Sequence, residues 1–375
     1  ISAQKPEDVF ADINTRFYGA AAKEMAAYWQ FIDRVWVDTP EYSGCGFGYL
    51  RRWTPERMAE ARKLLDAGLA ACKTELEKKR VTLADDSLKL FELFMKLRRD
   101  QAEGRFEKLA EEADVWRKRV VELGEQYKEN SCFTRVPYNN VTVNGSYFSQ
   151  FYQQTYNDAS RIAKHFDVLT PTPLRSFRYA TDPEKKGEAA GWGKPSFNDS
   201  AWKTTDVCNE TWSTLGLHDY FKSMWYRTTV KLPAVRVDRR VFLWLGSYDG
   251  SAKVFVNGKL VKPDGKTPTA TEAVGYCQPT SFDVTLAVED GDNTVAILCT
   301  RTDFNELGTG GLLGPAIIYA EKPPVWLPAT AHAVPKETAT EGEGYFSIIE
   351  GKNGRLYVGT HADRKSTRLN SSHRT

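Results

Sequence analysis

The spacing of apolar residues changes near residue 170, and this change limits the chain to a mixed architecture. Before that point apolar side chains recur every three or four residues, which is the period of a helix. After it, short β-branched and aromatic runs alternate with Gly, Asp, Asn and Pro turns, which is typical of an all-β domain. The 375 residues are enough for two to three domains. The sequence therefore predicts a helical part followed by an all-β part.

Residues 1–130 are predicted to form a helical bundle segment. The first helix is expected to begin near Pro6. Thr54–Glu56 reads Thr-Pro-Glu, which are the residue types of an N-cap and a first helical turn. Thr82 is expected to cap the following helix. Within residues 106–123, apolar side chains at alternating steps of three and four predict a seam that packs against another helix.

Seven strands are predicted in the second half, at a spacing typical of a β-sandwich. Asn257-Gly258 is the strongest hairpin signal, because a type I′ turn needs positive φ at both central residues. Phe255 is expected to point away from Val254 and Val256, as the strand period of two requires. The predicted strands are Leu174–Tyr179, Trp225–Leu232, Val241–Leu245, Ala252–Val256, Ser281–Leu286, Thr294–Thr300 and Ala316–Tyr319.

Charge and composition argue against several classes of partner. The net charge is +2, but the last thirteen residues, Asp363–Thr375, contribute +3, so the rest of the chain is slightly acidic. We therefore expect no nucleic-acid interface. No apolar run is long enough to predict a membrane span. The six Cys and five His are scattered and show no metal-ligand spacing, so neither a metal nor another cofactor is expected.

The segment Arg16–Asp33 reads RFYGAAAKEMAAYWQFID. It is similar to the segment that follows the barrel in a large, uncharacterised bacterial family of glycosidase-like proteins, distantly like α-glucuronidases. The resemblance covers roughly residues 6–130. It implies that the catalytic carboxylates lie in a barrel upstream of residue 1, as a partner in cis, and that this chain contains no catalytic residue.

A second resemblance is carried by motifs that occur in order through the β-rich half. They resemble the N-terminal sugar-binding domain of family 2 glycoside hydrolases, a jelly roll of the galactose-binding type, over about residues 170–322. The resemblance implies a carbohydrate (glycan) ligand and an extracytoplasmic (secreted or periplasmic) location. Asn198 stands where Asp is commoner, and Tyr276–Gln278 lacks the acid that can approach substrate in the enzymes. The motifs are FNDSAWKTTDV (197–207), WYRTTVKLP (225–233), VFLWLGSYDGSAKVFVNGKLV (241–261), SFDVT (281–285), DNTVAILCTR (292–301) and GGLLGP (310–315).

Four residues are candidate carbohydrate contacts. An aromatic ring stacks on the apolar face of a sugar, and acidic side chains accept hydrogen bonds from its hydroxyls. Trp192 and Trp212 lie in predicted loops, and Tyr248 and Asp249 lie where two predicted strands are joined. Each also has a structural interpretation, since a loop ring can pack in a core and an Asp commonly closes a turn.

Other residues of the β-rich half are expected to be structural. Trp202, Trp225 and Trp244 are predicted to pack in the core, because they lie in strands or in a turn motif. Arg227 is expected to form an ion pair within the fold.

The predicted organisation has five parts, and the chain is interpreted as cut at both ends. They are a helical region that would follow a barrel (1–130), a linker (131–169), the jelly roll (170–322), a linker with the start of a further β domain (323–362), and a tail (363–375). The tail sequence DRKSTRLNSSH resembles a translated sequencing adapter, so it is excluded from fold reasoning.

Three functions are compatible with these observations. The chain can be a fragment of a glycoside-hydrolase-like multidomain protein that carries non-catalytic helical and sugar-binding modules. It can instead be a cell-surface scaffold or protein-interaction module that binds no glycan, or a complete hydrolase with its own carboxylate pair. An open aromatic-lined groove favours the first function, and a buried set of tryptophans favours the second.

Overall fold

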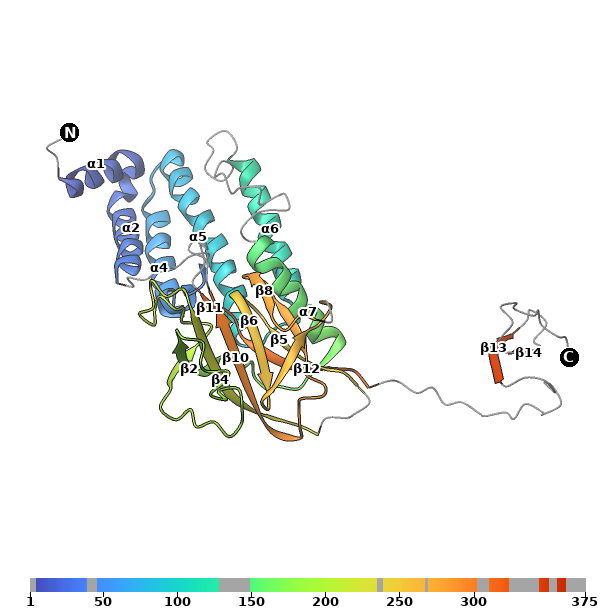
Figure 1. Ribbon diagram of the computed structural model, residues 1–375. Coiled ribbons are helices and arrows are strands. Elements are labelled where there is room, and N and C mark those ends of the chain that lie inside the picture. Colours follow the sequence, from blue (N-terminus) through green and yellow to red (C-terminus); the bar gives the residue numbers. More distant parts are fainter. Residues whose placement is uncertain are drawn as a thin grey trace. The chain divides into compact units, whose positions relative to one another are not determined.

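The computed structural model describes residues 5–38, 46–127, 149–234, 239–266, 269–301, 310–323, 344–350 and 356–361. These residues fall into two compact units, one within residues 1–323 and one within residues 324–375. The first unit combines helices with a curled antiparallel sheet (Figure 1). The second holds an antiparallel hairpin of β13 (Gly344–Glu350) and β14 (Leu356–His361). Trp326 and the tail after Ala362 lie outside the described residues.

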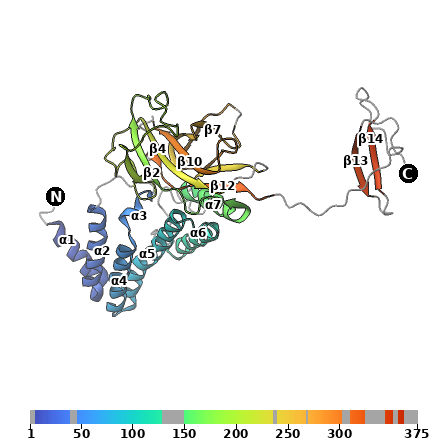
Figure 2. The same cartoon turned by 90° about the horizontal axis from the view of Figure 1, so that it is seen from below.

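The helices of the first unit pack on one another in succession, and the last two, Leu109–Gln126 and Gln154–His165, lie against the sheet (Figures 1 and 2). Most of them place an apolar face inward, as the three-to-four spacing of apolar side chains requires. Their bounds are α1 (Pro6–Tyr18), α2 (Ala22–Val37), α3 (Tyr49–Arg52), α4 (Pro55–Ala71), α5 (Glu75–Ala102), α6 (Leu109–Gln126) and α7 (Gln154–His165), with a 3-10 turn at Gly19–Ala21 and a π-helical turn at Ser149–Gln153.

One predicted helix cap is confirmed and one is wrong. Thr54 caps α4, because its hydroxyl accepts the backbone N–H of Arg57 at 3.3 Å. Thr82 lies inside α5 and caps nothing, because that helix already begins at Glu75. The cap is Thr74, which forms a capping box with Glu77. The hydrogen bonds of Thr74 and Glu77 satisfy backbone N–H groups at the start of α5. The helix therefore begins at Glu75, seven residues before Thr82.

Glu77 also ties the start of α5 to the turn after α1. Its carboxylate accepts the N–H groups of Ala20 at 2.9 Å, Lys73 at 2.7 Å and Thr74 at 3.0 Å. These bonds, with that of Ala20 the largest contributor, hold the pKa of Glu77 at about 2.

A depressed carboxyl pKa stabilises the fold above the unfolded-state pKa of about 4.3, and this stabilisation is lost as the pH falls toward 2. We expect Glu77→Gln to lower the thermal midpoint at pH 7, with the difference from wild type shrinking as the pH falls through this window. Thermal unfolding followed by circular dichroism between pH 2 and pH 7 tests this. Glu75→Gln, at an exposed acid of the same turn, is the control. If the thermal midpoints of Glu77→Gln and wild type differed by the same amount at every pH, the expectation would be contradicted.

The sheet is a single hydrogen-bonded path in the order β1-β12-β5-β9-β7-β6-β10-β4-β2-β3, with β8 and β11 also paired to β6. All seven predicted strands are confirmed within it, with ends that shift by a few residues. The strands are β1 (Phe166–Val168), β2 (Ser176–Asp182), β3 (Lys203–Asp206), β4 (Ser223–Leu232), β5 (Val241–Leu245), β6 (Tyr248–Val256), β7 (Lys259–Pro263), β8 (Ala273–Tyr276), β9 (Thr280–Asp283), β10 (Gly291–Thr300), β11 (Gly311–Leu312) and β12 (Ala316–Glu321).

The β6–β7 hairpin turns at the predicted dipeptide. Asn257 has φ 51° and Gly258 has φ 79°, as a type I′ turn requires. Val254 and Val256 join the core inside the curl, and Phe255 joins a separate cluster on the outer face. The predicted alternation of this strand is therefore confirmed.

The sheet curls around one hydrophobic core, to which both halves of the strand path contribute. Leu243 and Ile318, from β5 and β12, share this core with Tyr226 and Ile297, from β4 and β10. The structure thus confirms helices combined with a β-rich part, and that part is a curled antiparallel sheet. Its assignment as a jelly roll remains part of the proposal below.

Strand β5 joins the helices to the sheet, because both of its faces are buried. Val241, Leu243 and Leu245 point into the curl, while Phe242 and Trp244 pack with residues of α6 and α7. A continuous apolar strand of this kind has no solvent-facing side. The helical and β parts therefore share one unit within residues 1–323.

The segment predicted as a linker, residues 131–169, differs from the structure in its second half. Residues 149–168 form the π-helical turn, α7 and β1. Tyr156 and Ile162 are fully buried against the outer face of the sheet, and β1 pairs with β12. The many polar residues of this segment are typical of a linker. The apolar side chains of α7, however, lie on one face of the helix, and that face packs on the sheet.

Candidate functional site

Two of the four candidate carbohydrate contacts, Trp212 and Asp249, lie against the glycine pair Gly310–Gly311, and Tyr248 precedes Asp249 in β6. The Trp212 side chain is 1% exposed, and its indole N–H donates to the hydroxyl of Tyr226 at 2.7 Å. Tyr248 is equally buried, with its hydroxyl 3.0 Å from that of Thr280. Strand β11 pairs with the start of β6, which places Gly311 opposite Asp249 and Leu312 opposite Tyr248.

Asp249 is the acidic member of this cluster and is fully buried. Its Oδ2 accepts the backbone N–H of Gly310 at 2.7 Å, and its Oδ1 has no hydrogen-bond partner among the described residues. Burial raises the pKa of Asp249, while the Gly310 bond and the nearby charge of Arg301 act in the opposite direction. The acid therefore lies in the fold interior and does not close an exposed turn.

The buried rings of this cluster offer no open face for a sugar to stack on. Trp212 lies in a loop as predicted, but Gly310 and Gly311 pack so closely on its indole that a Cβ on either would lie within 3 Å of the ring. Both glycines have positive φ, at 75° and 78°. The Gly-Gly pair in the sequence was the signal for this close approach.

Trp192 lies apart from the other three candidates, on the outer face of the sheet. Its half-buried ring packs on Trp202 and Trp225, with ring centroids 5.0 Å and 6.2 Å away. The structure therefore does not gather the four candidates into one site, and Trp192 is the one whose ring reaches solvent.

Arg227 holds the loop that carries Trp192. Its Nε donates to Asp199 at 2.9 Å, and its other nitrogens donate to the carbonyls of Trp192 and Lys194. The side chain is only 4% exposed, so the predicted structural ion pair is confirmed. This pair links the FNDSAW motif to the WYRTT motif.

The tryptophans predicted as core residues behave accordingly. Trp225 in β4 and Trp244 in β5 are fully buried, and Trp202 is partly buried beside Trp192. Most of the aromatic rings in the β-rich half therefore stabilise the fold.

An open cleft of about 1230 Å³ lies between the helices and the sheet. It is bordered by the end of α5, residues 103–108, the start of α6, strand β1 and residues 170–173. No residue of this cleft was among the sequence-derived candidates. The lining comes from three separate stretches of the sequence, within residues 96–112, within 163–173 and at Ile317, and a sequence pattern shows no such convergence.

Ion pairs neutralise most of the charges that line the cleft. Lys96 bridges Asp100 at 2.7 Å and Glu112 at 2.6 Å, and Arg105 also bonds Asp100. Asp167 on the opposite wall pairs with Arg239 at 2.5 Å. The cleft therefore offers polar donors and acceptors without a strong excess of either charge.

Apolar side chains interrupt this polar lining. Phe166 and Val168 lie along β1 on one wall, and Pro171 and Pro173 follow them. Val168 is 40% exposed, so it can be changed without opening the core. The cleft therefore combines ion-paired polar groups with apolar side chains.

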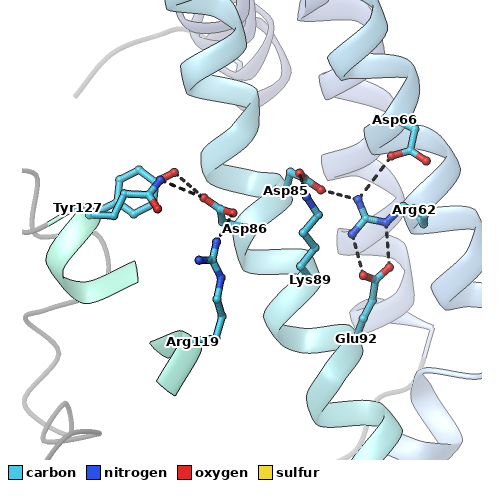
Figure 3. Close-up of polar contacts among 9 residues, drawn as sticks. Arg62, Asp66, Asp85, Asp86, Lys89, Glu92, Arg119 and Tyr127 are labelled. Atoms are coloured by element: carbon cyan, nitrogen blue, oxygen red, sulfur yellow. Dashed lines mark hydrogen bonds and ion pairs between the residues drawn. The ribbon is translucent and has the colours of Figure 1, made fainter. Parts of the chain in front are cut away.

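The helical layer holds a second concentration of charge (Figure 3). Adjacent residues Asp85 and Asp86 of α5 point to opposite sides, toward α4 and α6. Arg62 of α4 binds Glu92 with two hydrogen bonds of 2.9 and 2.8 Å and Asp85 with one of 2.5 Å. Asp86 accepts hydrogen bonds from Arg119 at 2.9 Å and from Tyr127 at 2.7 Å.

These charged residues hold the helices together and do not form an acid–base pair. Burial alone would raise the pKa of Asp85, but hydrogen bonds from Lys89 and Arg62 outweigh it and hold the pKa below the ordinary value. A general acid needs a raised pKa, near the working pH. Asp85 therefore stays ionised, as a structural partner of Arg62.

Among the described residues, no three His, Cys, Asp or Glu side chains are grouped so that they could hold a metal ion. In the same part of the chain, no helix is both long and apolar enough to cross a membrane.

Comparisons with known proteins give matches only among solved structures. No family model and no curated protein matches the sequence. A β-glucuronidase from Ruminococcus gnavus in complex with D-glucuronic acid is 18% identical over 40% of this chain, with a TM-score of 0.31. A Bacteroides uniformis β-glucuronidase is 23% identical over 41% of this chain, with a TM-score of 0.33.

These structural neighbours are glycoside hydrolases, and the similarity is weak and partial. The alignment covers 29% of the Ruminococcus chain and 18% of the Bacteroides chain. This chain therefore corresponds to less than a third of either enzyme.

Proposed function

We propose that this chain is the non-catalytic part of a glycoside-hydrolase-like multidomain protein, in which the curled sheet is a galactose-binding-like jelly roll. The ligand is a neutral oligosaccharide, and catalysis belongs to a barrel upstream in the same polypeptide. The proposed location is extracytoplasmic. The motif order supports the assignment, since Asp199 of one motif forms an ion pair with the buried Arg227 of another.

The observation that carries the proposed ligand is the cleft of about 1230 Å³. Its ion-paired side chains can bond hydroxyls without favouring an ion, and Phe166, Pro171 and Pro173 supply apolar contacts for sugar ring faces. Of the original candidates, Trp192 is proposed as a secondary contact, because it is only partly buried.

One observation favours the alternative, a scaffold or protein-interaction module without glycan binding. Trp212, Trp225 and Trp244 are all buried, so the aromatic richness of this half reflects packing more than ligand contact. Binding measurements separate the two functions.

Filling the cleft is expected to block the oligosaccharide. Val168→Trp places a large ring at an exposed position of the wall and should weaken binding by about tenfold, equivalent to about 1.4 kcal/mol. A glycan array identifies the ligand for the wild type, and calorimetric titration then compares the variants. Val274→Trp, at an exposed valine of β8 outside the cleft, is the matched control and should bind normally.

Three outcomes count against parts of this proposal. Equal binding by Val168→Trp and wild type would contradict the cleft as the site, and loss of binding in Trp192→Ala would then place it on the outer face. No binding by the wild type to any glycan would favour the scaffold function. Hydrolysis of aryl-glycosides by this chain would show that it carries its own catalytic residues.

A further inference from the structure

Helix α1 exposes an apolar stripe along one of its faces. Phe10, Ile13 and Phe17 recur at steps of three and four, so they lie on one face of the helix, with Val9 beside them. All four side chains are between 36% and 55% exposed. The residues that α1 buries are instead Asn14 and Tyr18. An amphipathic helix normally turns its apolar face inward, whereas much of this face is open to solvent.

The charges beside the stripe change sign along the helix. Glu7 and Asp8 lie at the N-terminal end, where both are exposed. Arg16 lies at the C-terminal end, and Arg80 of α5 covers the Phe17 ring with its guanidinium 4.7 Å from the ring centroid. Arg80 is fixed there by hydrogen bonds to the carbonyls of Arg16 and Phe17. Arg16 also pairs with Asp12 at 2.8 Å, and Lys5 precedes the first turn. One excess negative charge is left at the N-terminal end and, with Arg80, one excess positive charge at the C-terminal end.

We propose that the α1 stripe binds the same stripe of a second copy of this chain, with the two helices antiparallel. An antiparallel pairing that places Phe10 against the partner's Ile13 brings Glu7 close to the partner's Arg16. The acidic end of each helix then lies beside the basic end of the other. This contact occurs twice, because a two-fold axis relates the two copies. Parallel pairing would instead place like charges together. The stripe is short, so the dimer is weak, with dissociation in the micromolar range.

Sedimentation velocity over a wide range of protein concentration tests the proposal. The wild type should change from monomer to dimer as concentration rises. Ile13→Glu puts a charge in the middle of the stripe and should weaken association by at least about tenfold. Leu286→Glu, at an exposed leucine distant in sequence from α1, is the control and should dimerise like wild type. Thermal midpoints show that both variants remain folded.

A charge exchange tests the antiparallel orientation. Glu7→Arg alone brings like charges together in the antiparallel dimer and should weaken it. Combining Glu7→Arg with Arg16→Glu restores opposite charges across the antiparallel interface, so association should recover. In a parallel dimer the double variant would not recover.

The proposal is overturned by a wild type that stays monomeric at every concentration, which would leave the stripe to a different occupant such as a preceding domain. It is also overturned if Ile13→Glu dimerises as strongly as wild type. The glycan experiments do not depend on this result, because the cleft residues and the α1 stripe share no side chain.

Discussion

Replacing Gly311 with alanine is expected to destabilise the first unit by roughly 3–5 kcal/mol. Gly311 has φ 78°, and a Cβ there would lie 2.2 Å from the Tyr226 hydroxyl and 2.3 Å from the Trp212 indole nitrogen. The substitution therefore strains the backbone, which is in the left-handed region, and it also makes the new Cβ clash with two buried side chains. Chemical denaturation monitored by tryptophan fluorescence measures the loss.

Gly265→Ala separates these two contributions. Gly265 has a similar φ of 69°, but a Cβ there would meet no atom within 4 Å. It should cost only the backbone strain, about 1–2 kcal/mol. If both variants lost the same free energy of unfolding, crowding at Gly311 would be the wrong explanation.

Trp212→Ala is expected to cost roughly 3–5 kcal/mol, because it removes a buried indole and leaves a cavity. It also removes the donor that bonds Tyr226. Denaturation with urea, followed by far-ultraviolet circular dichroism, measures the change. Trp212→Phe keeps most of the apolar volume and should cost less, about 1–2 kcal/mol.

The opposite result would restore Trp212 as a ligand residue. If Trp212→Ala unfolded at the same urea concentration as wild type but lost glycan binding, the ring would have to be accessible in solution. We expect no such separation, because the Gly310–Gly311 segment packs against the indole.

The predictions that held depend on short-range regularities. Strand β5 is an unbroken run of apolar and aromatic residues, and its predicted and observed bounds agree at Val241–Leu245. Asn257-Gly258 forms the predicted turn, because few other dipeptides tolerate two positive φ angles. Thr54 caps α4 because its hydroxyl satisfies a nearby backbone donor.

The predictions that were wrong concern segments for which the local sequence allows more than one structure. Thr74 and Thr82 are both possible caps, and the Glu77 carboxylate decides between them through bonds that include one to distant Ala20. Residues 149–168 have a polar composition, but they become helix and strand because the outer face of β5 and β12 covers their apolar side chains.

The sequence by itself determined the class of each segment and the direction in which strand side chains point, because hydrogen-bonding period and turn stereochemistry act over a few residues. Only the tertiary structure decided which of those side chains reach solvent. Asp249 and Trp212 look like exposed loop residues along the chain, yet Gly310, more than sixty residues beyond Asp249, bonds the acid and packs on the indole. The cleft also depends on the tertiary structure, because its walls come from helices and strands that meet only when the chain folds. Burial depends on contacts between residues far apart in the sequence. The local sequence therefore determines the chemistry of a side chain, and tertiary packing determines whether that side chain is accessible to a ligand.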